Sequence, residues 1–136
     1  LNNLVQGEDG LEIYVMIEIP SNVILANEFA QIFNGFSIGS NDLTQLTLGL
    51  DRDSSFVNYL FNEENDAVKL LIHQAIQAAK QNKIKIGLCG QAPSDIPTFA
   101  KFLVEEGIDS ISFNPDALIR GIANILAAEN NLPDVH

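Results

Sequence analysis

Two carboxylates, Glu18 and Asp42, hold positions from which they could do chemistry together. Glu18 directly follows an apolar stretch that ends at Ile17, and Asp42 comes shortly after a second apolar stretch. If the two stretches are neighbouring strands, the carboxylates lie close together and repel unless a cation or a proton intervenes. Oxygen ligands suit Mg2+ or Mn2+ better than Zn2+, which prefers nitrogen and sulfur. The residues alone leave a second interpretation open, in which Glu18 forms an ion pair and Asp42 caps a helix.

Three small or polar residues, Gly39, Ser40 and Asn41, precede Asp42 and form a candidate anion site. A glycine lets the backbone approach a ligand closely. The amides of a helix that begins here would favour negative charge. We therefore expect a phosphate or carboxylate to bind these residues while Asp42 holds a metal. A tight strand-to-helix turn without a ligand would use the same residue types.

Cys89 and Arg52 are the other candidates for chemistry. Cys89 ends a third apolar stretch and precedes Gly90, which favours a thiol that faces a cleft and gives or takes a proton. A lone cysteine is also commonly a small buried apolar side chain. His73 lies inside a predicted helix, so we expect no histidine to serve Cys89 as a base. Arg52 could bind a phosphate or carboxylate in bidentate fashion, or pair with a neighbouring acid.

The elements that must position these residues are short apolar strands alternating with helices. Strands are predicted over residues 12–17, 35–38, 84–88 and 110–113. Helical spacing of apolar residues predicts helices over residues 21–33, 66–81, 94–106 and 115–129. Ser21 is expected to cap the first helix, Ser94 and Asp95 to begin the third, and Pro115 to lie in the first turn of the last.

This alternation predicts an α/β fold with parallel strands, in which functional groups collect at the carboxyl ends of the strands. Polar or reactive residues follow all four predicted strands, so they are expected to share one site. Four units are too few for a closed eightfold barrel, which needs roughly 200 residues or more. The chain is therefore either a small open sheet or half of a barrel.

Composition bounds the possible partners. The 136 residues suffice for one domain, and the 46% hydrophobic content indicates a globular chain. A net charge of −11 disfavours binding to nucleic acid or to anionic membranes. No apolar run reaches the ~18 residues of a membrane span, and no signal peptide is visible. The single cysteine, which allows no internal disulfide, fits a reducing compartment.

Together, five motifs resemble those of a known enzyme family over nearly the whole chain. They are E-I-P-S at 18–21, G-F-S-I-G-S-N-D-L-T-Q at 35–45, D-R-D at 51–53, G-L-C-G-Q at 87–91 and S-F-N-P at 112–115. Their order and spacing are similar to the C-terminal region of the phosphoenolpyruvate (PEP) synthases, which belong with the pyruvate, phosphate dikinases to the PEP-utilising enzymes. The resemblance implies that residues 1–136 are the C-terminal half of a PEP/pyruvate-binding TIM (β/α)8 barrel, with about four βα units.

The resemblance also implies roles for individual residues. Glu18 and Asp42 would be the Mg2+ ligands, with Mn2+ as an alternative ion. Residues 39–42, together with Glu18 and Arg52, would contact the substrate. Cys89 would be the proton donor to the enolate carbon.

For the parent enzymes the implied reaction is that of a pyruvate, water dikinase, from ATP, pyruvate and water to AMP, PEP and phosphate through a phosphohistidine. The phosphohistidine and ATP-grasp motifs do not occur in these residues, so we expect the isolated chain to be inactive. Expected partners are pyruvate or PEP, the remaining domains of a parent enzyme, and a second copy in a homodimer or through self-association. The alternative is a non-catalytic, stand-alone α/β module that binds a metal or an anion.

Overall fold

A computed structural model describes residues 5–51 and 54–131, and these residues form one parallel sheet. The sheet has the order β1-β2-β3-β4, and each neighbouring pair runs parallel. The strands are β1 (Tyr14–Ile17), β2 (Gly35–Gly39), β3 (Lys85–Cys89) and β4 (Ser110–Ser112). The predicted parallel α/β fold is therefore confirmed.

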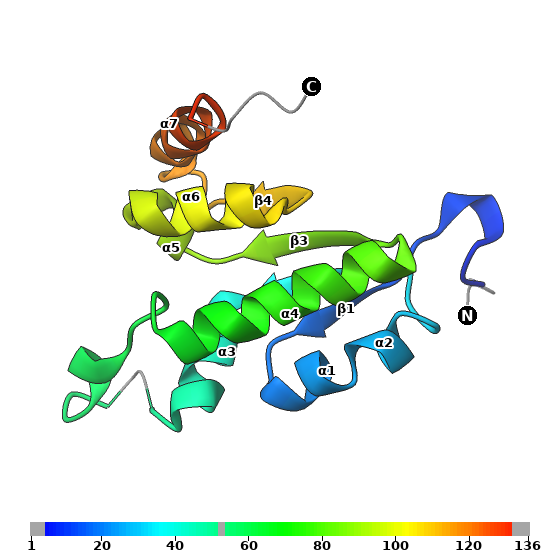
Figure 1. Cartoon of the computed structure of the whole chain (residues 1–136), viewed down its shortest axis with the longest axis horizontal. Coiled ribbons are helices and arrows are strands. Elements are labelled where there is room, and N and C mark those ends of the chain that lie inside the picture. Colours follow the sequence, from blue (N-terminus) through cyan, green and yellow to red (C-terminus); the bar gives the residue numbers. More distant parts are fainter. Residues whose placement is uncertain (1–4, 52–53, 132–136) are drawn as a thin grey trace.

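Helices follow the strands and pack outside the sheet (Figure 1). They are α1 (Pro20–Ile24), α2 (Ala26–Phe29), α3 (Ser40–Leu48), α4 (Asp66–Asn82), α5 (Ala92–Asp95), α6 (Pro97–Glu106) and α7 (Leu118–Glu129), with short 3-10 turns η1 (Glu8–Gly10) and η2 (Asn58–Leu60). Helix α7 does not lie on the sheet itself but packs against α5 and α6. It therefore forms the outermost layer at one end of the molecule.

The hydrophobic core lies between the sheet and the helices. Phe36 and Ile38 of β2 lie beside Ile86 and Leu88 of β3 on one face, and all four are at most 2% exposed. They belong to the same buried cluster as Ile72 of α4. Full burial of one such side chain contributes roughly 1.5–3 kcal/mol, so this face holds the sheet and the helices together.

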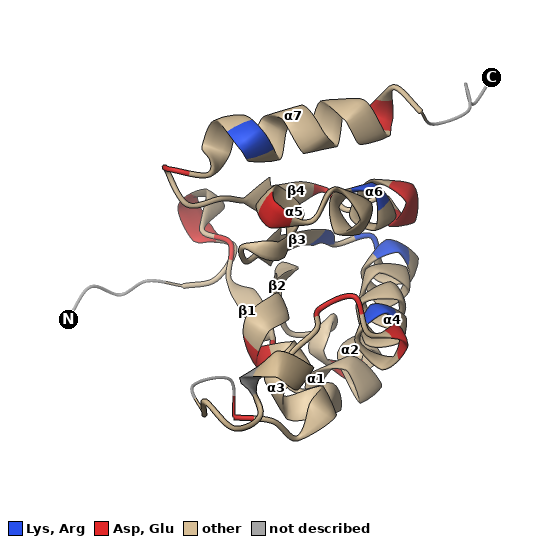
Figure 2. Cartoon of the chain, turned by 90° about the vertical axis from the view of Figure 1, so that its left-hand side faces the viewer, with Lys and Arg blue, Asp and Glu red and all other residues tan. Residues whose placement is uncertain are grey.

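The other face of the sheet is open. Alternate residues of each strand point to this face, among them Met16, Ser37 and Cys89. The side chains of Tyr14 and Met16 are 42% and 38% exposed. Figure 2 looks onto the ends of the strands, with α4 and α6 on one side of the sheet. A parallel sheet of four βα units that is covered by helices on one face only has the form of half a TIM barrel, as predicted.

The prediction of one continuous first helix, capped by Ser21, is wrong. The structure divides it at Leu25, whose backbone leaves the helical region at φ −103 and ψ 23. Ser21 is not the N-cap, because Pro20 opens α1 and leaves Ile19 in the capping position. Apolar spacing continues through the break, so periodicity could not reveal it.

The starts of the later helices also differ from prediction. Ser94 and Asp95 do not begin a long helix but end the short α5, and Pro97 opens α6 after them. Pro115 lies in a turn closed by the hydrogen bond from the Ala117 amide to the Asn114 carbonyl at 3.0 Å. The last helix therefore starts at Leu118 and not at the proline.

Candidate active site

The predicted site residues that the structure describes meet at the carboxyl ends of the strands. Glu18 directly follows β1, Gly39 ends β2, and Cys89 ends β3. Gly39 and Cys89 are partners in the register of the sheet. Arg52 lies outside the described residues. The sheet thus brings one residue from each of three neighbouring strand ends to a common edge.

Glu18 reaches over the end of the neighbouring strand. A methyl group built on Gly39 would lie 3.2 Å from Glu18 Oε2 and 3.2 Å from Glu18 Cβ, so the carboxylate covers this glycine. A methyl group at position 39 would also lie 3.2 Å from Met16 Cε, so Glu18 and Met16 would both have to shift by a few tenths of an ångström. The glycine therefore makes room for a carboxylate from β1 at the start of α3.

Asp42 lies in the first turn of α3 and is exposed. Residue 39 holds the N-cap position, where no side chain caps the helix. The interpretation of Asp42 as a helix cap is therefore wrong, although a carboxylate in the first turn still interacts favourably with the helix dipole. Among the described residues no group of three or more histidine, cysteine or acidic side chains forms a metal cluster.

Ser40 is buried without a partner at the same place. Its side chain is 0% exposed, and within the described structure its hydroxyl makes no hydrogen bond. A methyl group on Gly90 would overlap Ser40 Oγ, so the hydroxyl points at the turn that follows Cys89. A buried hydroxyl without a partner is costly, and the start of α3 therefore offers an unused donor beside its backbone amides.

Cys89 is half-buried on the open face of the sheet. Its thiol donates to the Ile38 carbonyl at 3.4 Å, and the Ser37 hydroxyl donates to its sulfur at 3.9 Å. Sequence reasoning missed Ser37. The signal was its position two residues before Gly39, which places both residues on the same face of β2.

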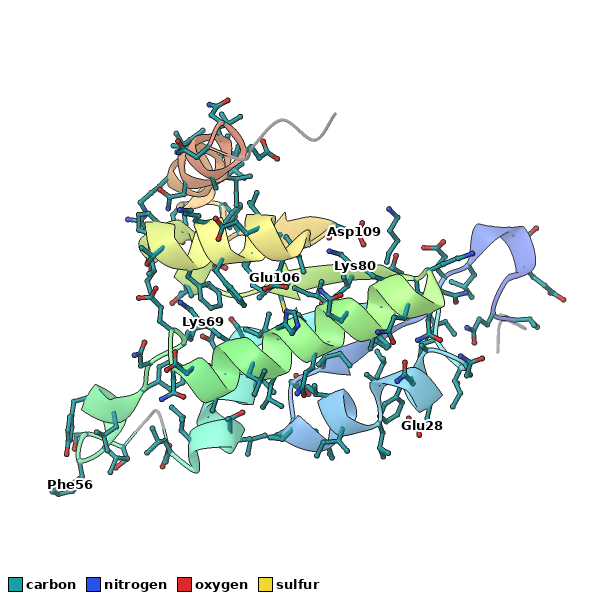
Figure 3. All side chains as sticks on the ribbon, in the orientation of Figure 1. Glu28, Phe56, Lys69, Lys80, Glu106 and Asp109 are labelled. Atoms are coloured by element: carbon teal, nitrogen blue, oxygen red, sulfur yellow. The ribbon has the colours of Figure 1, made fainter. Side chains whose placement is uncertain are left out.

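The structure agrees with the expectation that His73 lies inside a helix and does not serve Cys89 as a base. His73 lies in α4, and its Nδ1 is 2.6 Å from Glu106 Oε2 in α6. Lys80 also reaches α6, where it donates to the Glu106 carbonyl (Figure 3). These contacts join two helices of the outer layer, so His73 is not positioned as a base for Cys89.

Three of the described cations are paired with acidic side chains. Lys85 contacts Asp109 at 3.2 Å, and Lys69 contacts Glu64 at 3.6 Å. Arg120 contacts Asp95 at 2.6 Å, on the short helix that follows the Cys89 turn. Anion binding at the start of α3 would therefore draw on backbone amides, on the Ser40 hydroxyl and on a metal held by Glu18 and Asp42, whose oxygen atoms fit Mg2+.

A half-barrel with polar groups at its strand ends defines an α/β protein whose candidate site lies at the carboxyl ends of its strands. Residues 1–130 match the family described as "PEP-utilising enzyme, PEP-binding domain". The chain belongs to this family.

Individual relatives agree with the family. The chain is 63% identical to phosphoenolpyruvate synthase from Synechocystis over 96% of its length, and 61% identical to that from Aquifex aeolicus over 93%. Identity to the Escherichia coli enzyme of the same name is 59% over 86% of the chain. The chain spans only 16%, 15% and 15% of these relatives.

A solved structure supports the fold. A citrate synthase variant, SbnG, matches 88% of this chain and 48% of its own with a TM-score of 0.53. The sequence identity is 17%, so this likeness concerns the fold alone. Matching about half of a larger chain agrees with a half-barrel.

In the part of the chain that the structure describes, no helix is long and apolar enough to cross a membrane.

Proposed function

We propose that the chain is the C-terminal half of the PEP/pyruvate-binding barrel of a phosphoenolpyruvate synthase. The observation that carries the proposal is the meeting of Ser40 and Gly90. It sets a buried, unpartnered hydroxyl at the start of α3 against the turn that follows Cys89. A hydroxyl that can donate a hydrogen bond to an anion and a thiol thus lie at adjacent strand ends. The family match and the names of the relatives support the substrate class.

In this proposal the carboxylates hold the metal and the start of α3 holds the anion. Glu18 and Asp42 would bind Mg2+ or Mn2+, and such an ion stabilises negative charge on substrate oxygens. Backbone amides of residues 40–42 and Ser40 Oγ would hold the phosphate or carboxylate of the substrate. Arg52 would add a positive charge, which a site in a chain of net charge −11 needs.

Cys89 would carry the proton. Its Sγ would give a proton to the methylene carbon of the enolate when pyruvate forms, and the thiolate would take one from the methyl carbon in the direction of PEP synthesis. Ser37 would hold the sulfur, because its hydroxyl can donate to a thiolate. This proton transfer needs no histidine, in agreement with the distant position of His73.

The remaining parts of the reaction would come from outside these residues. A parent enzyme would contribute the first half of the barrel, the ATP site and the phosphohistidine, and would act in the cytoplasm as a homodimer. The small share of each relative that the chain spans supports this division. We expect the 136-residue chain alone to produce no PEP from ATP and pyruvate.

Paired substitutions test the metal assignment in the longer protein that we propose carries this chain. Glu18→Gln and Asp42→Asn should weaken Mn2+ binding and lower PEP synthesis about 100-fold or more, because each removes a charged metal ligand. Glu28→Gln on α2 and Asp66→Asn, in the first turn of α4, are the matched controls. Mn2+ binding is followed by electron paramagnetic resonance. Unchanged binding in both site variants would refute the assignment.

A further inference from the structure

We propose that Asn124, on the outermost helix α7, is a positioning residue for the turn that carries Cys89. Its Nδ2 donates to two backbone carbonyls of α5, that of Pro93 at 3.1 Å and that of Ser94 at 3.0 Å. Helix α5 begins directly after Gln91 and so continues from the Cys89 turn. The role in catalysis rests on the proposed function, whereas the role in holding the turn does not.

Helix α5 cannot hold its place by itself. It has four residues, far fewer than the ~12 at which isolated helices become marginally stable. A helix also leaves its last carbonyls without partners inside the helix. Asn124 supplies donors to two carbonyls of this kind. The contacts with α7 therefore act together with the burial of Ala92, Pro93 and Ser94 in fixing the position of α5.

From α5 the contacts lead directly to the turn. Ser94 is 1% exposed, its hydroxyl donates to the Gln91 carbonyl at 2.7 Å, and its amide donates to the same carbonyl at 3.0 Å. Gln91 is two residues from Cys89. A shift of α5 would therefore move the backbone beside the thiol.

A second contact joins the same two helices. Arg120 Nη2 lies 2.6 Å from Asp95 Oδ1, one helical turn before Asn124 on α7. Residues four apart share one face of a helix, so Arg120 and Asn124 form one contact surface toward α5. Both ends of the short helix segment 93–95 are thereby held.

The turn is also held on the side of α3. Gly90 lies so close to Ser40 Oγ that an added methyl group would overlap the oxygen. The segment 89–91 is thus fixed at Gly90 by α3 and at Gln91 by α5. We infer that release of α5 would loosen the contact with Ser40 and open Cys89 to solvent.

Alkylation of Cys89 tests this inference without reference to catalysis. Iodoacetamide is applied to the longer protein well below its melting temperature, and the Cys89 peptide is followed by mass spectrometry. Asn124→Ala should raise the alkylation rate about tenfold, because loss of two hydrogen bonds favours local opening. Asn131→Ala is the matched control, since Asn131 donates to the Ala127 carbonyl of its own helical segment. The control rate should equal that of the unchanged protein.

Further readouts separate positioning from general destabilisation. Asn124→Ala should lower kcat for PEP synthesis about tenfold while leaving the KM for ATP unchanged. An alkylation rate equal to that of the unchanged protein would overturn the inference, even with a lower melting temperature. An equal rise in Asn131→Ala would overturn it too. If Asn124→Ala does not fold, Arg120→Ala replaces it, with an expected rise of about threefold, and an unchanged rate there is equally decisive.

The outcomes also separate this inference from the proposed function. Faster alkylation in Asn124→Ala together with full activity in Cys89→Ala would retain the positioning role and refute Cys89 as the proton donor. Unchanged alkylation in Asn124→Ala together with an inactive Cys89→Ala would refute the positioning role and retain Cys89 as the proton donor.

Discussion

At the scale of single residues, glycines at the strand ends decide how closely the functional groups approach. Gly39 accommodates the Glu18 carboxylate, and Gly90 accommodates the Ser40 hydroxyl. In both places the added methyl group would meet an atom at 3.2 Å or less. These contacts cross from one strand end to the next, so the two glycines let groups of neighbouring strands approach one another closely.

Gly90→Ala should destabilise the protein by roughly 1–3 kcal/mol, because its methyl group would overlap Ser40 Oγ. Ser40→Ala in the same chain removes that oxygen. Ser40 Cβ would lie 3.6 Å from the added methyl group, an ordinary contact distance. The double variant should therefore recover most of the loss, as measured by urea unfolding. Equal stability of the single and double variants would show that Ser40 is not the neighbour that matters.

At the scale of elements, helices could be predicted from the sequence where a capping residue and regular apolar spacing mark their boundaries. The predicted helix 66–81 corresponds to α4, because Asn65 caps its start through the Ala67 amide and apolar residues recur at helical spacing. The order of strands and the grouping of Glu18, Gly39 and Cys89 at one edge were predicted in the same way. The extent of α3 was not specified, although Gly49 in the left-handed conformation ends it.

The tertiary contacts could not be predicted from local pattern. The approach of Ser40 to Gly90 and the contact of Ser37 with Cys89 each join segments about 50 residues apart. The contacts of Asn124 with α5 depend on where α7 packs, which no local periodicity specifies. Such contacts arise from the packing of whole elements, so the predicted site lacked Ser37 and Asn124.

The end of α4 provides a prediction at the scale of elements. Lys83 holds the C-cap position in the left-handed conformation, at φ 58 and ψ 34. A side chain there costs roughly 1 kcal/mol, so Lys83→Gly should stabilise the protein by about 0.5–1 kcal/mol. Lys101→Gly, within α6, should instead destabilise it by about 1 kcal/mol. Thermal unfolding compares the two variants, and a loss of stability in Lys83→Gly would contradict the expected strain.

At the scale of the whole molecule, the half-barrel leaves surfaces that a larger assembly would cover. Strands β1 and β4 lie at the edges of the described sheet. A groove of about 440 Å³ lies between α6, β4 and α7, with Ile108, Ile111 and Phe113 in its wall. On α7, Ile119 is 79% exposed. Open strand edges beside apolar surface favour association with another chain or domain.

The isolated 136-residue chain should therefore self-associate or be only marginally stable. Pairing at the open strand edges and burial of apolar surface on α7 are the physical reasons. Sedimentation velocity over a dilution series measures the expected shift from larger species to monomer. A stable, well-packed monomer at all concentrations would contradict the expectation that these surfaces need a partner.

The exchange of pyruvate methyl protons with solvent deuterium tests the central claim most directly. In the longer protein with Mg2+, we expect Cys89→Ala to slow this exchange by about 100-fold to 10,000-fold, because its thiol is the group that we propose carries the proton. His73→Gln, in the α4–α6 contact, should exchange at the rate of the unchanged protein. Exchange at that same rate in Cys89→Ala would contradict the assignment of the strand-end site and of its thiol.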